Sequence, residues 1–175
     1  MDLKQDHFSL FGLQRRFRID SAALERSYKD MQATVHPDRH ASLPEAQRRV
    51  SMQWAARLNE AYRTLRAPLS RAQYLLQVHG IDVQHESNTV MPADFLMEQM
   101  EWREAVAEAR AAEDATGLEA ILRRLREHRQ DLVDALEVAL DEREDWDKGA
   151  DLARRLMFLE KLNHDIDEAL VDLEG

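Results

Sequence analysis

The stretch His36-Pro37-Asp38 decides the fold of the first part of this 175-residue chain. Proline has no backbone N–H and disfavours the α conformation of the residue before it, so the helical pattern over residues 22–35 must end here. A second helical pattern, over residues 42–66, follows after a short polar spacer. We therefore expect a helical hairpin whose tip displays an imidazole, a proline ring and a carboxylate to solvent as a recognition surface.

Apolar side chains on both sides of this tip recur at spacings of three and four, the period of an amphipathic helix. Asp20 or Ser21 can cap the first helix, and Pro68 begins a third, short helix that Gly80 ends. The side chains expected to face the interior are Leu24, Tyr28, Met31 and Val35 in the first helix and Val50, Trp54, Leu58, Ala61, Tyr62 and Leu65 in the second. We expect these two stripes to pack together.

The second half of the chain contains three longer helical patterns, over residues 92–113, 118–140 and 145–173. The breaks between them are predicted at residues 116–117 and 141–144, and no alternating pattern of useful length predicts a strand. Three amphipathic helices with short connections form an antiparallel bundle. The sequence therefore predicts an all-α protein with an N-terminal helical-hairpin domain (1–80), a linker (81–91) and a C-terminal three-helix bundle (92–175).

Composition and charge restrict the possible functions. The chain has no cysteine, which excludes disulfides, thiolate catalysis and cysteine-held metal centres, and we expect no cofactor. It shows neither a signal-peptide pattern nor an apolar run of the ~20 residues that a membrane span needs, so we expect a cytoplasmic protein without a membrane partner. Residues 1–80 carry 13 Lys/Arg against 8 Asp/Glu, a charge of +5, and residues 81–175 carry 11 against 26, a charge of −15. This asymmetry indicates two domains with different partners and argues against nucleic acid as one of them.

The loop residues themselves allow more than one hypothesis. His36, Asp38 and His40 could hold a metal ion, or act as an acid/base pair, in a small metal-dependent hydrolase, because imidazole and carboxylate suit both tasks. The nearby acids Asp30 and Glu45 lie on helices that nothing forces to converge on the loop. A purely structural hypothesis treats the tripeptide as a helix stop, which explains the proline but not the exposed histidine and aspartate beside it.

The hairpin, its His-Pro-Asp tip and the adjoining arginine resemble the J-domain of DnaJ-family co-chaperones. The resemblance implies that the loop and the helix before it bind a DnaK-class chaperone and stimulate its ATP hydrolysis. The residues assigned in this way are His36, Pro37, Asp38, Arg39, Arg26 and Lys29. Glu25, Asp30 and Thr34 stand where many family members carry basic residues, so we expect a dedicated chaperone partner. The alternative for Arg26 and Lys29 is an ordinary solvated helix face.

The helix expected over residues 92–113 has two apolar faces when its residues are spaced by about 100°. The face expected to pack into the bundle carries Phe95, Trp102, Val106 and Ala109. The opposite face carries Leu96, Met97 and Met100, is bordered by Glu101, Glu104 and Glu108, and can be extended by Phe158 of the last helix. A contiguous apolar surface rimmed by acids is typical of a protein-binding site. The alternative is a helix that its neighbours bury on most sides.

Over nearly its whole length the chain resembles the HscB family of co-chaperones, through the J-domain pattern and through residues 74–80, 95–101 and 156–162. The resemblance implies that the J-domain binds the DnaK-class chaperone HscA and that the bundle binds the iron–sulfur scaffold IscU, which promotes cluster maturation without catalysis by the chain itself. The implied scaffold-binding residues are Leu96, Met97, Met100, Glu101, Glu104, Glu108 and Phe158. Met100 and Trp102 replace leucines of the family pattern. The cysteine-rich zinc segment of eukaryotic relatives is missing, which favours a bacterial form without metal.

Overall fold

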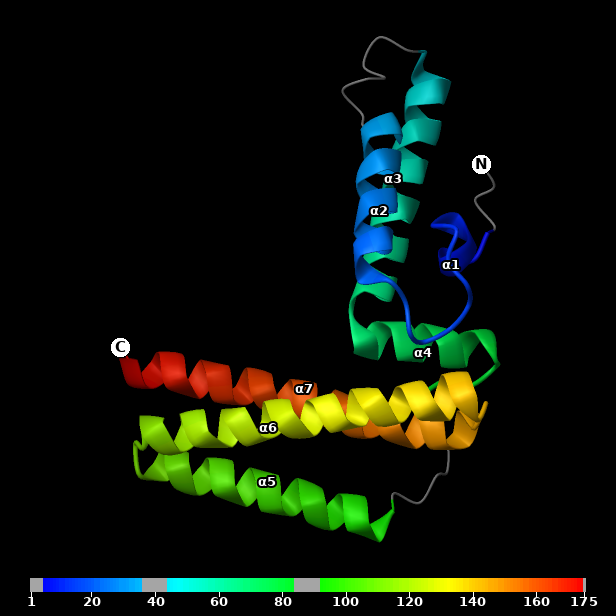
Figure 1. The fold of residues 1–175 in the computed structure, drawn as a ribbon. Helices are drawn as coiled ribbons and strands as arrows, with labels where there is room; N and C mark the ends of the chain where they lie inside the picture. Colours follow the sequence, from blue (N-terminus) through cyan, green and yellow to red (C-terminus); the bar gives the residue numbers. More distant parts are fainter. Residues whose placement is uncertain (1–4, 36–43, 84–91, 175) are drawn as a thin grey trace. The chain divides into compact units, whose positions relative to one another are not determined.

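The structure, a computed structural model, describes residues 5–35, 44–83 and 92–174. Every regular element within these ranges is helical, which confirms the predicted all-α class. The chain divides into two compact units, Met1–Val78 and His79–Gly175 (Figure 1). The tip residues 36–40 and most of the expected linker lie outside the described residues. No helix in the described part of the chain combines the length and the apolar character needed to cross a membrane.

The first unit is built on two antiparallel helices, α2 (Ser21–Val35) and α3 (Glu45–Arg66) (Figure 1). The short helix α1 (His7–Leu10) packs against α3, and α4 (Pro68–Val78) follows α3 after one residue. Asp20, one of the two caps that the sequence allows, accepts a hydrogen bond from the Ala23 N–H at 2.9 Å. Side chains from all four helices and from the α1–α2 connection fill the core, chiefly Phe8, Phe17, Leu24, Leu58, Leu65, Leu75 and Leu76.

The contact between α2 and α3 follows the predicted stripes with one exception. The Tyr28 ring stacks on the Tyr62 ring at a centroid distance of 4.0 Å, and the Tyr28 hydroxyl donates to Oδ1 of Asn59 at 2.8 Å. Val50, expected on the buried stripe of α3, is instead 50% exposed. Helical periodicity identifies a face of a helix but not how far along that face a neighbour covers it.

Helix α1 is an element that sequence analysis did not predict, and Asp6 makes it possible. The Asp6 carboxylate accepts hydrogen bonds from the N–H groups of Phe8 and Ser9, both at 3.0 Å, and from the Arg15 guanidinium at 2.9 Å. Partial burial favours the protonated acid, but the bonds from Ser9 and Arg15 outweigh it and lower the pKa of Asp6 to about 2. The ionised side chain therefore caps α1 at neutral pH.

The α1 cap places His7 in the core of the first unit. Its ring stacks on the Tyr74 ring of α4 at a centroid distance of 4.2 Å, and its backbone N–H donates to the Tyr74 hydroxyl at 3.0 Å. Nδ1 of His7 is buried and has no hydrogen-bond partner among the described residues. Burial disfavours the imidazolium and lowers the pKa of His7, so the ring is held neutral.

The second unit is a bundle of α5 (Ala93–Ala111), α6 (Ala115–Glu137) and α7 (Trp146–Glu174), which lie side by side (Figure 1). A π-helical turn, η2 (Val138–Glu142), extends α6, and α5 packs against both longer helices. The bundle core is apolar throughout and includes Phe95, Val106, Leu118, Leu125, Leu136, Leu156, Leu159 and Ile166. Among the described helices of the second unit, only α6 and α7 pack against α5, which leaves one side of α5 uncovered within that unit.

The predicted breaks between these helices are displaced. Thr116 and Gly117, expected in a connection, lie in the first turn of α6, where the Asp114 carboxylate accepts a hydrogen bond from the Gly117 N–H at 2.9 Å. A Cβ at position 117 would clash with that carboxylate in its present position, so any other residue there would force the Asp114 side chain to shift. Residues 141 and 142, expected in the second connection, belong to η2.

Candidate functional site

Helix α5 presents a buried and an exposed apolar face. Phe95 and Val106 are 2% and 6% exposed, whereas Leu96, Met97 and Met100 are 46%, 63% and 69% exposed. The three exposed side chains are one helical turn apart or adjacent, so they form one contiguous surface. We refer to Leu96, Met97 and Met100 as the α5 patch.

Trp102 and Ala109 depart from the prediction that they belong to the core. Both are half-buried, at the edge of the contact between α5 and its neighbours. The Trp102 ring faces α6, where the Arg124 guanidinium lies 5.2 Å from its centroid and the His128 ring lies 6.3 Å away. Trp102 is therefore a boundary residue whose environment is charged on one side.

The acids predicted to border the patch are exposed. Glu101, Glu104 and Glu108 form no ion pair with another residue in the described part of the chain. Their spacings of three and four place them along one side of α5, next to Met97. The patch therefore has a negative border whose charge no described cation neutralises.

Phe158, expected to extend the patch, lies on α7 and is half-buried. It meets Phe95 edge-on, with centroids 6.1 Å apart and planes at 83°. The guanidinium of Arg103 lies 5.5 Å from the Phe158 ring centroid. Phe158 thus lies beside α5 and offers part of its ring on the side of the helix that carries Arg103.

Arg155 fixes the position of the first turns of α5 against α7. Its guanidinium bonds to the carboxylates of Asp94 at 2.7 Å, Glu98 at 3.1 Å and Asp151 at 3.2 Å, and lies 4.9 Å from the Phe95 ring centroid. Burial alone favours a neutral guanidinium, but the hydrogen bond to Asp94 and the charge of Asp151 prevail and raise the pKa of Arg155. The same hydrogen bond lowers the pKa of Asp94. The helix that carries the patch is thereby tied to the helix that carries Phe158.

Sequence analysis missed Arg155 and its acidic partners. Two of the three ion pairs join residues about 60 positions apart, Asp94 and Glu98 with Arg155. The available signal was local: Asp94 and Glu98 are one turn apart on α5, and Asp151 and Arg155 are one turn apart on α7. Such spacing indicates charged stripes but does not say which stripes meet.

Only part of the expected chaperone-binding site is described. Arg26 is exposed on α2 and forms no ion pair with another described residue. Lys29 pairs with Glu25 at 2.6 Å, and this hydrogen bond raises the pKa of Lys29 and lowers that of Glu25. His36, Pro37, Asp38, Arg39 and His40 lie outside the described residues.

The described residues also bear on metal binding. Over residues 5–35, 44–83 and 92–174, no group of three or more His, Asp or Glu side chains is arranged to hold a metal ion. The three residues of the metal hypothesis, His36, Asp38 and His40, are not among those residues. The described geometry therefore does not test that hypothesis.

A family model described as the HSCB C-terminal oligomerisation domain matches residues 91–167. Over 99% of its length the chain is 56% identical to a relative from Aromatoleum aromaticum named Co-chaperone protein HscB homolog, and the match spans 98% of that relative. A relative of the same name from Chromobacterium violaceum is 53% identical over 98% of this chain and 97% of its own length.

The fold is also similar to solved structures of proteins named HscB. The structure of the chaperone HscB from Vibrio cholerae matches with a TM-score of 0.83 and 33% identity, over 97% of this chain and 99% of that one. The crystal structure of the human co-chaperone protein HscB matches with a TM-score of 0.89 and 30% identity, over 96% of this chain and 83% of that one.

Proposed function

The chain belongs to the HscB family of co-chaperones, and we propose that it binds the iron–sulfur scaffold IscU through its bundle and delivers it to the DnaK-class chaperone HscA. In this proposal the J-domain stimulates ATP hydrolysis by HscA in the cytoplasm. Tethering raises the concentration of the scaffold at the chaperone, and the loop couples docking to hydrolysis. The chain acts as an adaptor between two proteins and carries out no reaction itself.

The observation that supports scaffold binding is the exposed α5 patch. Three contiguous apolar side chains, each at least 46% exposed, lose contact with water only when another molecule covers them. Methionine adapts its shape to a partner, and two of the three are methionines. The proposed site consists of the patch, its acidic border and the ring beside it: Leu96, Met97, Met100, Glu101, Glu104, Glu108 and Phe158.

The chaperone-binding part of the proposal rests on the family membership and on the sequence of the hairpin. Its residues are the loop, His36, Pro37, Asp38 and Arg39, together with Arg26 and Lys29 on α2. Since Lys29 is paired with Glu25, Arg26 is the cation of this face that is available to a partner among the described residues. The hydrolase that would use His36, Asp38 and His40 is favoured by no observation on the described residues.

Calorimetric titration of IscU into wild-type protein and into Leu96→Ala/Met100→Ala tests the scaffold site. Burial of a Leu or Met side chain contributes roughly 1.5–3 kcal/mol, so the double variant should bind about 10- to 100-fold more weakly. The matched control is Val171→Ala/Leu173→Ala, which truncates two apolar side chains that are also exposed, 68% and 37%, near the end of α7.

The control should bind like wild type, and all three proteins should have the same melting temperature. Equal affinity of the Leu96/Met100 variant and wild type would contradict the proposed site. A lower melting temperature of that variant would show that the patch belongs to the core.

A further inference from the structure

Arg103 lies at the edge of the α5 patch that faces α7. It follows Met100 by one turn of α5, and its guanidinium is 5.5 Å from the centroid of the Phe158 ring. Two of the residues proposed to bind the scaffold, one on each helix, therefore adjoin this cation. Arg103 is exposed, and its guanidinium forms neither a hydrogen bond nor an ion pair with a described residue.

None of the residues one turn away from Arg103 on α5, or one turn away from Phe158 on α7, is an acid. On α5 the residues that share the face of Arg103 are all uncharged: Gln99, Met100, Val106 and Ala107. On α7 two further cations, Arg154 and Lys161, precede and follow Phe158 by one turn. Neither forms an ion pair with a described residue, and we refer to these two and Arg103 as the α7-side cations.

Two acids lie farther along the same face of α7. Asp151 is engaged by two cations of its own helix, Lys148 at 3.4 Å and Arg155 at 3.2 Å. Asp165 is half-buried and forms no ion pair with a described residue. The three α7-side cations thus face a single unpaired acid, although residues 81–175 as a whole carry a charge of −15.

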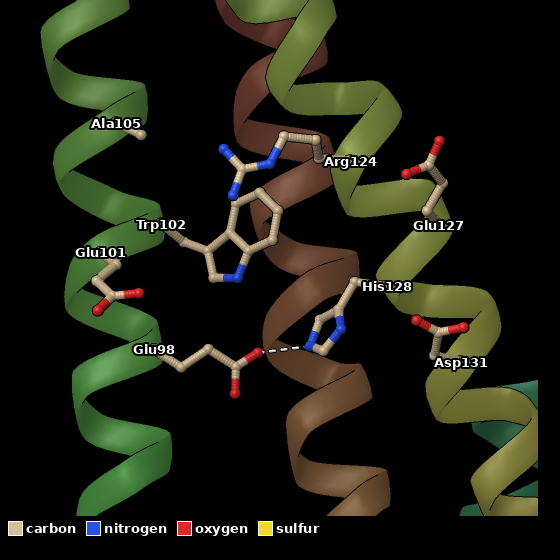
Figure 2. A pocket seen from close by; sticks show the side chains of 8 residues that line it. All are labelled: Glu98, Glu101, Trp102, Ala105, Arg124, Glu127, His128 and Asp131. Carbon is tan, nitrogen blue, oxygen red and sulfur yellow. Dashed lines mark hydrogen bonds and ion pairs between the residues drawn. The ribbon is translucent and has the colours of Figure 1, made fainter.

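The side of α5 that faces α6 is different. A cavity of about 420 Å³ lies between the two helices there, and charges of both signs line it (Figure 2). Oε1 of Glu98 is 2.6 Å from Nε2 of His128, and Arg124, over the Trp102 ring, shares the cavity with three further acids. On the α6 side the positive charges thus have acids beside them, whereas Arg103 on the α7 side has none.

A partner that covers the proposed scaffold site takes the Arg103 guanidinium out of water. The guanidinium lies against Phe158 and next to the α5 patch, so a protein surface that contacts both also covers it. Removing a cation from water costs free energy unless other groups accept its hydrogen bonds. Since no described residue of this chain does so, the partner has to supply the acceptor. A carboxylate fits best, because it carries the opposite charge and can accept two parallel hydrogen bonds from a guanidinium.

We infer that the scaffold protein places a carboxylate on the Arg103 guanidinium, at the point where the α5 patch adjoins Phe158. This inference rests on the proposed function, since it adds a contact to the same complex. It makes Arg103 a specificity-determining residue, because a partner with an apolar surface and a basic group at this point would meet like charge. It also orients the scaffold, because its acid must lie toward the α7-side cations and away from Glu101, Glu104 and Glu108.

The test titrates IscU into full-length wild-type protein, Arg103→Met and Arg103→Glu at low salt. Methionine keeps an unbranched apolar chain beside Phe158 and removes the charge, so binding should weaken about 5- to 20-fold. Glutamate places a second carboxylate against the first, so Arg103→Glu should bind about 3- to 10-fold more weakly than Arg103→Met. At about 0.5 M salt the difference between the two variants should shrink, because salt screens the repulsion.

Arg126→Met is the matched control. Arg126 is likewise exposed and forms no ion pair with a described residue, and its spacing of two residues from Arg124 places it on the opposite side of α6 from the cavity. The control should bind IscU within about twofold of wild type, which separates a contact at Arg103 from the loss of positive charge anywhere on the unit. All variants should melt close to wild type, since both arginines are exposed.

Two results would overturn the inference. An Arg103→Met protein that binds as tightly as wild type, or is weakened only as much as Arg126→Met, would show that no acid contacts Arg103. An Arg103→Glu protein that binds at least as tightly as Arg103→Met would show that the group on Arg103 is not a carboxylate.

The outcomes separate this inference from the proposal on which it rests. If Leu96→Ala/Met100→Ala weakens binding and Arg103→Met does not, the scaffold site stands and the acidic contact is wrong. If wild-type protein does not bind IscU, both are wrong. If Arg103→Met changes the sedimentation of the free protein, the occupant is a second copy of this chain, which also contradicts the inference.

Discussion

The two units differ in how close their proposed binding residues are, along the chain, to the residues that stabilise the fold. In the first unit the proposed site is the stretch His36-Pro37-Asp38, between α2 and α3 in the sequence, whereas the charged and buried polar groups that shape the unit, Asp6 and His7, belong to α1 and its cap. In the second unit the proposed site is the outer face of a core helix, and adjacent residues divide the tasks: Phe95 is 2% exposed and Leu96 is 46% exposed. In the first unit, binding and folding therefore depend on different segments of the chain. In the second unit, they depend on the two faces of a single helix.

The largest effect is expected at the hairpin tip. Asp38→Asn should abolish stimulation of the HscA ATPase and leave the melting temperature and IscU affinity unchanged, because the sequence predicts an exposed loop at this position and an exposed carboxylate contributes little to folding. Steady-state ATP hydrolysis by the chaperone is the measurement, with Asp172→Asn in the bundle as the control. Equal stimulation by the Asp38 variant and wild type would contradict the loop assignment.

The next effect tests the two faces of α5. Phe95→Ala should lower the free energy of unfolding by about 3–5 kcal/mol, because it removes a fully buried ring and leaves a cavity. Trp102→Ala should cost less, because this ring is only half-buried. Denaturant titrations of both variants and of Leu96→Ala measure the three losses in free energy of unfolding. If Leu96→Ala were as unstable as Phe95→Ala, α5 would not have one buried and one exposed apolar face.

A smaller effect is expected at the cap of α1. Asp6→Ala should lower the stability of the first unit by about 1–2 kcal/mol through loss of the helix cap, whereas Asp6→Asn keeps an acceptor and should lose less. Amide hydrogen exchange resolves the two units, and protection should fall in the first unit only. Uniform loss of protection in both units would show that they unfold as one.

The pH dependence of the first unit should reflect His7. Its pKa is lowered in the folded state and ordinary, about 6.5, in the unfolded state, so the unfolded chain binds more protons between these values. Stability is therefore fully present above pH ~6.5 and is lost as the pH falls below it. His7→Phe preserves an aromatic ring against Tyr74 and removes the titration, so its stability between pH 5 and 7 should be flatter than that of wild type in chemical denaturation.

The smallest effect is expected when the first unit is removed. A fragment of residues 79–175 retains the stack of His79 on Trp146, at a centroid distance of 3.7 Å, and all three bundle helices. It should fold and bind IscU within about twofold of the full chain, as circular dichroism and calorimetry can determine. A fragment that fails to fold would show that the two units share a core.

Helices whose apolar residues recur over several turns could be predicted from the sequence. Elements that depend on the hydrogen bonds of a single side chain could not. The stripes from Leu24 to Val35 and the two faces around Phe95 and Leu96 follow from helical geometry. Helix α1 has only four residues and exists because the Asp6 carboxylate caps it. A capping aspartate cannot be recognised from the sequence alone, because many similar polar segments do not begin a helix.

Errors at other positions have equally local causes. Gly117 suggested a break, but the Asp114 cap occupies the space of its missing Cβ and the helix continues through it. The cavity between α5 and α6 was missed because it joins Trp102 to Glu127 and Asp131, which no sequence period connects. Periodicity predicts which side of a helix is covered, whereas ion pairs and cavities depend on which helices meet.

The Arg155 network has a kinetic consequence. Two ion pairs, from Asp94 and Glu98 to Arg155, tie α5 to α7, so we expect the helix to keep its conformation when a partner arrives and binding at α5 to involve little loss of conformational entropy. Encounters between preorganised surfaces proceed without a slow rearrangement, and changes at such interfaces act mainly on the dissociation rate. Variants of the α5 patch should therefore shorten the lifetime of the complex and leave its association rate nearly unchanged.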